Sequence, residues 1–166
     1  MEAMGFGLFP QHILDMKTHP LKDLPLDAQK RAECEMLLQS LEHFKPRRYE
    51  LEIDGYKQSG EFLMVQVMNI SMFGPNLLFA PQADPGDGLL DVVAFTKDDR
   101  SKLQQYLERR IRKNQASFPV ETVRAKKVLI HSSDERYHIE DELLANDEKK
   151  PVEISVNENS VSIFTP

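Results

Sequence analysis

The sequence predicts a mostly β domain, in which two antiparallel sheets pack as a sandwich with two flanking helices. Three observations lead to this fold class. After residue 48, short segments of alternating or continuous apolar residues follow one another along most of the chain. Turn-forming pairs such as Asp54-Gly55 separate them, as is typical of consecutive antiparallel strands. Only residues 27–45 and a stretch beginning near residue 98 show the apolar spacing of surface helices.

The composition excludes several classes of function. A net charge of −6 argues against general nucleic-acid binding, which needs a basic surface to displace counterions from phosphates. The single cysteine, Cys34, has no partner for a disulfide or a zinc site, and we expect it in the core. No apolar run approaches the roughly 18 residues of a membrane span, and no signal peptide is evident. We therefore expect a cytoplasmic protein that touches a membrane only from its surface.

The first 45 residues are expected to contain a strand and the clearest helix. Residues 1–26 combine glycines, prolines and large apolar side chains, which predicts a strand or extended arm followed by a short helical turn. In residues 27–45 the apolar side chains fall on one face, with Asp27 as the predicted N-cap and Pro46 ending the helix.

From residue 48 the pattern changes to the period of two that is typical of strands. Asp54-Gly55 predicts a hairpin turn, and Ser59-Gly60 predicts a second turn or a bulge. Residues 62–70 are apolar on both faces, which indicates a central strand covered on both sides. Another strand is expected at residues 89–95.

The second helix is expected to begin at Asp98 or Asp99, and its apolar stripe consists of Leu103, Tyr106, Leu107 and Ile111. It ends in a basic cluster of Arg109, Arg110, Arg112 and Lys113. These cations either complement the helix dipole or contact anionic lipid headgroups, and both interpretations stay open. The last strands are expected at 127–131, 136–140, 151–156 and 160–164, with a tight turn at Asn157-Glu158-Asn159.

The stretch from Asn69 to Val93 is a loop between two strands with the chemistry of a cation site. Its glycines and prolines fix the backbone, while Asp84 and Asp87 supply hard oxygen ligands that suit Mg²⁺ or Ca²⁺. An ordinary turn is the alternative interpretation. An EF-hand is excluded because its spacing and its closing glutamate are missing.

As a whole string, this stretch resembles the C-terminal domain of the diacylglycerol kinase and sphingosine kinase superfamily, including the YegS-like and DgkB-like bacterial lipid kinases. The matching residues are Asn69, Gly74, Ala80-Pro81, Ala83 and Asp87-Gly88-Leu89-Leu90-Asp91-Val92. The resemblance implies a structural Mg²⁺ held by the Asp87 carboxylate and by the backbone carbonyls of Asp84 and Leu89. It also places residues 4–9 at the crossing between two lobes, so that Met1 need not be the natural start.

A second acidic group, Glu140-Asp141-Glu142, would ordinarily be a solvated loop between strands. The resemblance aligns it with an Asp-Gly-Glu motif in the same superfamily. It implies that Glu142 is the general base that accepts the proton of a lipid hydroxyl, with Glu140 as the supporting acid. Two departures bear on the geometry: Asp141 replaces a glycine that could adopt positive φ, and Glu140 is one methylene longer than aspartate. His138 is expected to be an ordinary strand residue that faces either solvent or the core.

The superfamily binds ATP through an N-terminal lobe with a Gly-Gly-Asp-Gly-Thr motif, a string that these 166 residues do not contain. We therefore expect residues 1–166 to be one domain, the lipid-side lobe of an ATP-dependent lipid kinase acting on a diacylglycerol-like or sphingoid hydroxyl, and inactive as an isolated fragment. Its expected partners are the lipid substrate and the ATP-binding lobe of the same protein. A homodimer and a peripheral membrane contact are left open.

Two alternatives to the kinase function stay open. One is a non-catalytic module that binds a lipid or a protein, and the other is a structural sandwich whose acidic loops have no function.

Overall fold

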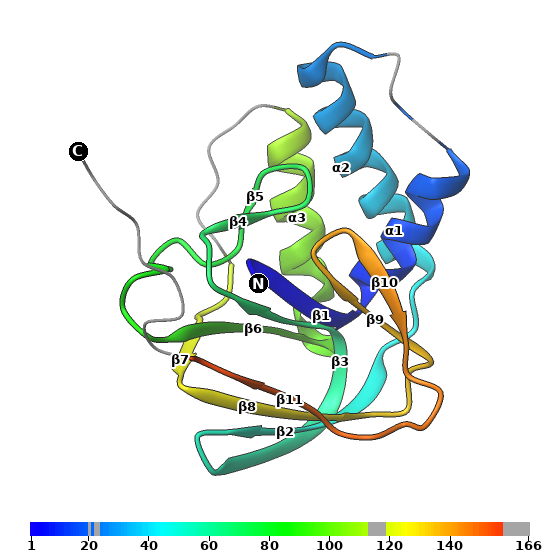
Figure 1. Ribbon diagram of the computed structural model, residues 1–166. Coiled ribbons are helices and arrows are strands. Elements are labelled where there is room, and N and C mark those ends of the chain that lie inside the picture. Colours follow the sequence, from blue (N-terminus) through cyan, green and yellow to red (C-terminus); the bar gives the residue numbers. More distant parts are fainter. Residues whose placement is uncertain (20, 22–23, 113–118, 158–166) are drawn as a thin grey trace, which may run out of the picture.

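The computed structural model describes residues 1–19, 21, 24–112 and 119–157 (Figure 1). Its helices are α1 (Leu8–Thr18), α2 (Leu26–His43) and α3 (Arg100–Ile111), the last preceded by a 3₁₀ turn at Lys97–Asp99. Its strands are β1 (Ala3–Gly7), β2 (Arg47–Ile53), β3 (Tyr56–Met68), β4 (Met72–Phe73), β5 (Leu77–Leu78), β6 (Leu90–Thr96), β7 (Val123–Ala125), β8 (Lys127–Ser132), β9 (Arg136–Ile139), β10 (Glu142–Ala145) and β11 (Val152–Ser155).

Strand β3 connects the two layers of the sandwich. On one edge it pairs with β2 as far as Phe62 and with β1 from Met64 onward, while its other edge pairs with β6. Strands β9 and β10 extend the β1 layer, and β8 and β11 extend the β2 layer, so that nine strands of the described chain form one bent antiparallel sheet (Figure 1). The register shift between Phe62 and Met64 marks the point where the layers separate. The predicted mostly β, antiparallel, sandwich-like fold is confirmed.

Two apolar clusters cover opposite faces of β3. Val65 and Val67 point between the layers, towards Tyr49 and Ile130, whereas Met64 and Met68 point towards the helices. Residues Phe62–Met68 are all buried, which confirms the prediction of a central strand covered on both sides. The helices pack side by side on the outer face, with α2 between α1 and α3 (Figure 1).

The turn from β1 into α1 depends on Gly7. Its φ is 88°, and a Cβ there would lie 2.4 Å from the carbonyl oxygen of Leu63. Only glycine combines this backbone conformation with so close an approach. Helix α1 has 11 residues instead of the predicted short turn, and it makes a third flanking helix in the described chain because its buried face, including Leu8 and Phe9, packs on the sheet.

Some local predictions were wrong. The Ser59-Gly60 turn does not form, because residues 56–62 pair with β2 without interruption. Helix α2 begins at Leu26 after Pro25, so Asp27 lies in its first turn, where a carboxylate still favours the dipole. Asp99 does precede α3 as predicted, but its carboxylate accepts hydrogen bonds from Thr96.

The strands β4, β5, β7 and β10 were not predicted. The expected strand at 160–164 and most of its preceding turn lie outside the described residues.

Candidate functional site

The three carboxylates predicted from the sequence lie on one hairpin. Strands β9 and β10 pair from Ile139 with Glu142 onward, and Glu140 and Asp141 form the two-residue turn. The resemblance to the superfamily raised the question of a positive φ at position 141. In the structure Glu140 has the positive φ, at 52°, and Asp141 does not. Asp141 therefore does not occupy the conformation for which glycine would be needed. Glu142 is the first residue of β10 and is exposed.

Glu140 is tied to the sheet at three points. Its backbone nitrogen donates to the Ala3 carbonyl oxygen at 2.9 Å, and its Oε1 accepts from the backbone nitrogen of Glu2 at 2.7 Å. Its carbonyl oxygen lies 2.9 Å from Nδ1 of His138. The Glu140 carboxylate thus holds the start of β1, whereas the exposed carboxylate of Glu142 is accessible to a substrate.

His138 lies directly beneath this turn and is fully buried. Its ring stacks on Phe73, with centroids 4.9 Å apart and planes inclined by 21°, and Phe9 lies 6.0 Å away. Its Nε2 is 2.9 Å from the carboxamide of Gln66 on β3. Burial lowers the pKa of His138 to about 4, so the ring is neutral near pH 7. It occupies a core position, one of the two places expected from the sequence.

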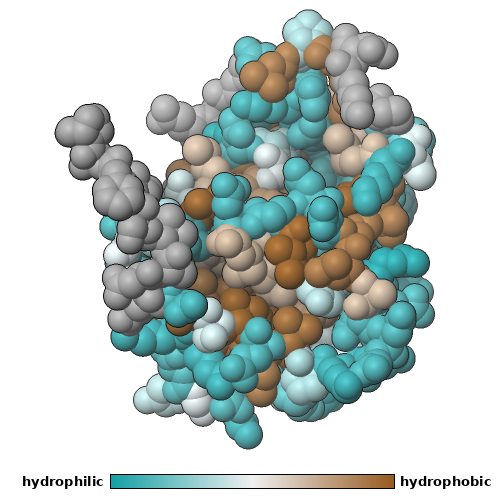
Figure 2. All heavy atoms as spheres, in the orientation of Figure 1, coloured by the Kyte–Doolittle hydropathy of each residue, from teal (hydrophilic) through white to brown (hydrophobic). Residues whose placement is uncertain are grey.

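A pocket of about 520 Å³ opens beside the hairpin, between α1, α2 and the β4–β5 turn. We call it the α1 pocket. Its lining is largely apolar and includes Asp141 from the hairpin; the other residues are Phe9, His12, Ile13, Met16, Lys17, Leu21, Gln29, Glu33, Phe73, Gly74 and Pro75. Apolar and polar surface interleave on the face that carries β10 and the β4–β5 turn (Figure 2). The pocket thus combines apolar walls with a carboxylate at the hairpin.

His12 is the most enclosed polar side chain of the α1 pocket. It is 4% exposed, and its Nδ1 has no hydrogen-bond partner among the described residues. Burial lowers its pKa to about 4, although the carboxylate of Asp15 acts in the opposite direction. A neutral imidazole in this position adds no charge to the pocket wall near pH 7.

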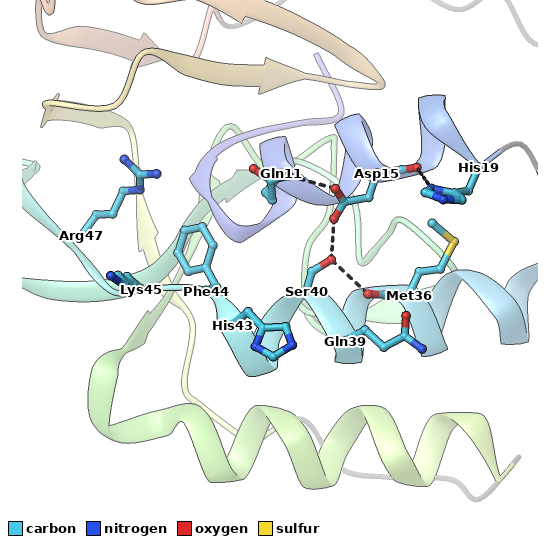
Figure 3. A pocket seen from close by; sticks show the side chains of 10 residues that line it. All are labelled: Gln11, Asp15, His19, Met36, Gln39, Ser40, His43, Phe44, Lys45 and Arg47. Carbon is cyan, nitrogen blue, oxygen red and sulfur yellow. Dashed lines mark hydrogen bonds between the residues drawn. The ribbon is translucent and has the colours of Figure 1, made fainter.

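A larger pocket, of about 650 Å³, lies on the other face of α1 (Figure 3). Its central group is Asp15, whose two carboxylate oxygens accept hydrogen bonds from Gln11 at 2.9 Å and Ser40 at 2.6 Å. The bond from Ser40 joins α2 to α1, the bond from Gln11 lies within α1, and each carboxylate oxygen of Asp15 has a partner. Although larger, this pocket is therefore a weaker candidate for proton transfer than the α1 pocket.

The predicted metal loop is held mainly by its own backbone. Asp84 Oδ1 accepts from Gly86 N at 2.9 Å, and Asp87 Oδ1 accepts from Leu89 N at 2.8 Å. Asp87 N also donates to the Asp84 carbonyl oxygen at 3.2 Å. The second oxygen of Asp87 pairs with the guanidinium of Arg124. The predicted ligands Asp84, Asp87 and Leu89 therefore share one compact turn.

The donor set of this turn suits Mg²⁺ in chemical type, because it offers a carboxylate and backbone carbonyls. Next to Asp87, the buried Asp91 has an Oδ1 atom without a hydrogen-bond partner among the described residues, and burial raises its pKa. Such an atom is commonly satisfied by water or an ion. Arg124 competes for the same carboxylate, so a cation would have to share Asp87 with it. No group of three His, Cys, Asp or Glu side chains that could hold a metal occurs in the described chain.

The two predicted sets of site residues stay apart. Figure 1 shows the β9–β10 turn and the loop at 80–88 on opposite sides of the N-terminal end of β1. Sequence reasoning missed Gln66 and His12, since nothing in the local pattern distinguishes a polar residue that the fold buries. Among the helices in the described part of the chain, none has the length and apolar character to cross a membrane.

Comparison with known proteins gives consistent results. Residues 25–165 match the model of a family described as the YegS C-terminal NAD kinase beta sandwich-like domain. A curated diacylglycerol kinase of Mycobacterium tuberculosis is 32% identical over 68 residues, which cover 40% of this chain and 22% of that protein.

Solved structures share the fold. A candidate diacylglycerol kinase from Bacillus anthracis superimposes with a TM-score of 0.62 at 19% identity, covering 95% of this chain and 50% of that chain. A further diacylglycerol kinase structure from the same species gives a TM-score of 0.52 at 17% identity, covering 87% and 44%. The chain thus spans half or less of these relatives' lengths.

Proposed function

Because the chain belongs to the YegS C-terminal NAD kinase beta sandwich-like domain family, we propose that it is the lipid-side lobe of an ATP-dependent lipid kinase. The observation that carries the proposal is the position of the acidic hairpin beside the α1 pocket. Asp141 is both part of the turn and part of the pocket lining. A lipid hydroxyl at this end of the pocket would lie beside Asp141, one residue before Glu142, which is not among the residues that line the pocket.

The α1 pocket has the properties of an acceptor site for an apolar chain. Its walls include Phe9, Ile13, Met16 and Phe73, and its volume of about 520 Å³ lies in the usual range for small-molecule sites. A diacylglycerol-like or sphingoid lipid would place its acyl or alkyl part against these side chains. Its polar head would then face Asp141 at the hairpin.

Glu142 is the proposed general base. The lipid oxygen forms a bond to the γ-phosphorus of ATP, the bond from that phosphorus to the oxygen of ADP breaks, and the hydroxyl proton passes to Glu142. Glu140, whose carboxylate is bound to the backbone of Glu2, has the supporting role of fixing the turn. Phosphoryl transfer depends mainly on positioning and electrostatic stabilisation, so a rigidly held hairpin supports the proposal.

ATP would bind mainly to another lobe of a longer protein. We also propose Mg²⁺ at the loop, with the Asp87 carboxylate and the carbonyls of Asp84 and Leu89 as ligands. When bound there, the ion would supply structural charge neutralisation next to the buried Asp91. The chain's own residues in this loop orient backbone carbonyls and hold Arg124 beside Asp87.

The test is phosphoryl transfer from labelled ATP to a panel of lipid acceptors by the natural full-length protein that contains residues 1–166. The Glu142→Gln variant should lose about 10²-fold or more in kcat, as the removal of a positioned base costs. Glu148→Gln, which neutralises an exposed carboxylate paired with Lys150, is the matched control and should retain activity. A parent protein that binds lipid but transfers no phosphate to any acceptor would contradict the proposal and favour a non-catalytic binding module.

A further inference from the structure

The side chains of Gln66 and His138 meet across a strand position that has no side chain. Gly5 on β1 pairs with Gln66 on β3 at one edge and with His138 on β9 at the other. Residues directly opposite one another in adjacent strands point to the same face, so both side chains extend over Gly5. A Cβ at Gly5 would lie 2.5 Å from the Gln66 carboxamide. The amide reaches the imidazole because position 5 is glycine.

The resulting hydrogen-bond chain has one consistent arrangement of donors. The Glu140 carbonyl can only accept, so the His138 Nδ1 atom beside it carries a proton. A buried neutral ring then has an acceptor at Nε2, and the amide atom 2.9 Å away must be the donor nitrogen of Gln66. A half-turn of the carboxamide places its nitrogen there. This orientation gives Gln66 Nε2 the partner that it otherwise lacks among the described residues, and it moves Oε1 from beside His138 to the former position of Nε2.

The surroundings keep this chain in place beneath the turn. Phe73 stacks on the imidazole and Phe9 packs beside it, so the ring has no room to swing away. Above it, Glu140 has a φ of 52°, a left-handed conformation that is unfavourable for a non-glycine residue. The bond from His138 to the carbonyl of that residue offsets part of the cost. The hydrogen bonds from Gln66 through His138 to Glu140 therefore stabilise the conformation in which the turn presents its carboxylates.

We propose that Gln66 and His138 are positioning residues, which fix the acidic turn through the Glu140 carbonyl and so hold Glu142 in the orientation needed to accept a substrate proton. The inference rests on the proposed function, because Glu142 is a base only if the protein is a kinase. The imidazole itself transfers no proton to substrate, since it lies in the core below the turn.

The first test detects the hydrogen-bond chain by NMR and needs no measurement of enzyme activity. In the full-length protein labelled with ¹⁵N-histidine, NMR at pH 7 should show His138 as a neutral ring with its proton on Nδ1. Gly5→Ala changes neither the histidine nor the acids, but it displaces the Gln66 amide and should shift the His138 Nε2 resonance. A proton on Nε2, or ring resonances that are unchanged in Gly5→Ala, would overturn the proposal.

The second test separates positioning from general loss of stability. His138→Leu should lower kcat about tenfold with unchanged KM for ATP and lipid, whereas His138→Asn keeps a donor towards Glu140 and should stay within about threefold of the parent. Tyr49→Phe is the matched control, because it removes a buried hydrogen bond to Asp134 on the other face of the sheet. The proposal is overturned if Tyr49→Phe lowers kcat equally, or if the asparagine variant is no better than leucine. A parent protein without kinase activity would refute the proposed function and this kinetic role together, while the NMR result would still decide whether the hydrogen-bond chain exists.

Discussion

The acidic hairpin and the loop at residues 80–88 are both turns rich in carboxylates, but they are held in different ways. The hairpin depends on partners far away in the sequence: Glu140 bonds to Glu2 and Ala3, and the His138 beneath it bonds to Gln66. In the loop, the Oδ1 atoms of Asp84 and Asp87 accept from backbone nitrogens two residues further on, and Arg124 is a distant partner of Asp87. The difference indicates that the hairpin keeps its geometry only in the folded sandwich, whereas the loop keeps much of its shape by itself.

The largest expected effect is a loss of stability when a side chain that supports the hairpin is removed, compared with one that supports the loop. Phe9→Ala removes a buried ring that packs beside Phe73, Phe79 and His138, and we expect it to lower the free energy of unfolding by about 3–5 kcal/mol. Asp84→Ala removes one exposed local hydrogen bond and should cost about 1 kcal/mol or less. Urea unfolding of both variants measures the difference, and equal costs would show that the loop is as strongly coupled to the fold as the hairpin.

The same distinction explains what the sequence could predict. The turn at Asp54-Gly55 depends only on two residues that tolerate positive φ, and both adopt it, with φ of 46° and 87°. The Ser59-Gly60 pair gives an equally local signal, but pairing with β2 overrides it. The contact between Gln66 and His138 joins residues 72 positions apart, and no local pattern contains it.

The candidate site was predictable to a similar extent. The resemblance of whole strings singled out the acidic group and the loop predicted to bind a metal, and the structure places each on its own turn. It did not indicate that Glu140 would have the positive φ, because that depends on how β9 and β10 pair with each other. Nor did it identify the α1 pocket, whose walls come from α1, α2 and the β4–β5 turn.

A pH dependence should distinguish the buried helical side of the molecule from the exposed loop. The pKa values of His12 and His138 are lowered by burial from 6.5 to about 4. The unfolded chain therefore binds protons that the folded chain does not between about pH 6.5 and 4, and stability falls as the pH falls through this window, by up to about 3 kcal/mol per histidine. Unfolding measured from pH 7 to 4 should show a smaller decrease in His138→Asn than in the parent. An identical decrease in the two proteins would mean that His138 is protonated equally in both states.

The smallest expected effect concerns Arg124, which lies on β7 beside the loop. Its guanidinium pairs with Asp87 while remaining 42% exposed, so the ion pair is partly screened. Arg124→Gln should free the carboxylate and tighten Mg²⁺ binding by about threefold to tenfold, an energy on the order of 1 kcal/mol. Calorimetric titration with Mg²⁺ measures this change, with Lys126→Gln as a nearby charge-matched control. Weaker binding in Arg124→Gln would show that the arginine supports the site instead of competing for it.

The most direct measurement of the central claim is phosphoryl transfer to lipid by the full-length protein, compared between Glu142→Gln and Asp87→Asn over a range of Mg²⁺ concentrations. If the hairpin carries the base and the loop only braces the structure, Glu142→Gln stays about 10²-fold slower at every Mg²⁺ concentration, while Asp87→Asn regains activity as Mg²⁺ rises. Full activity of Glu142→Gln, or a loss in that variant that excess Mg²⁺ reverses, would contradict the account.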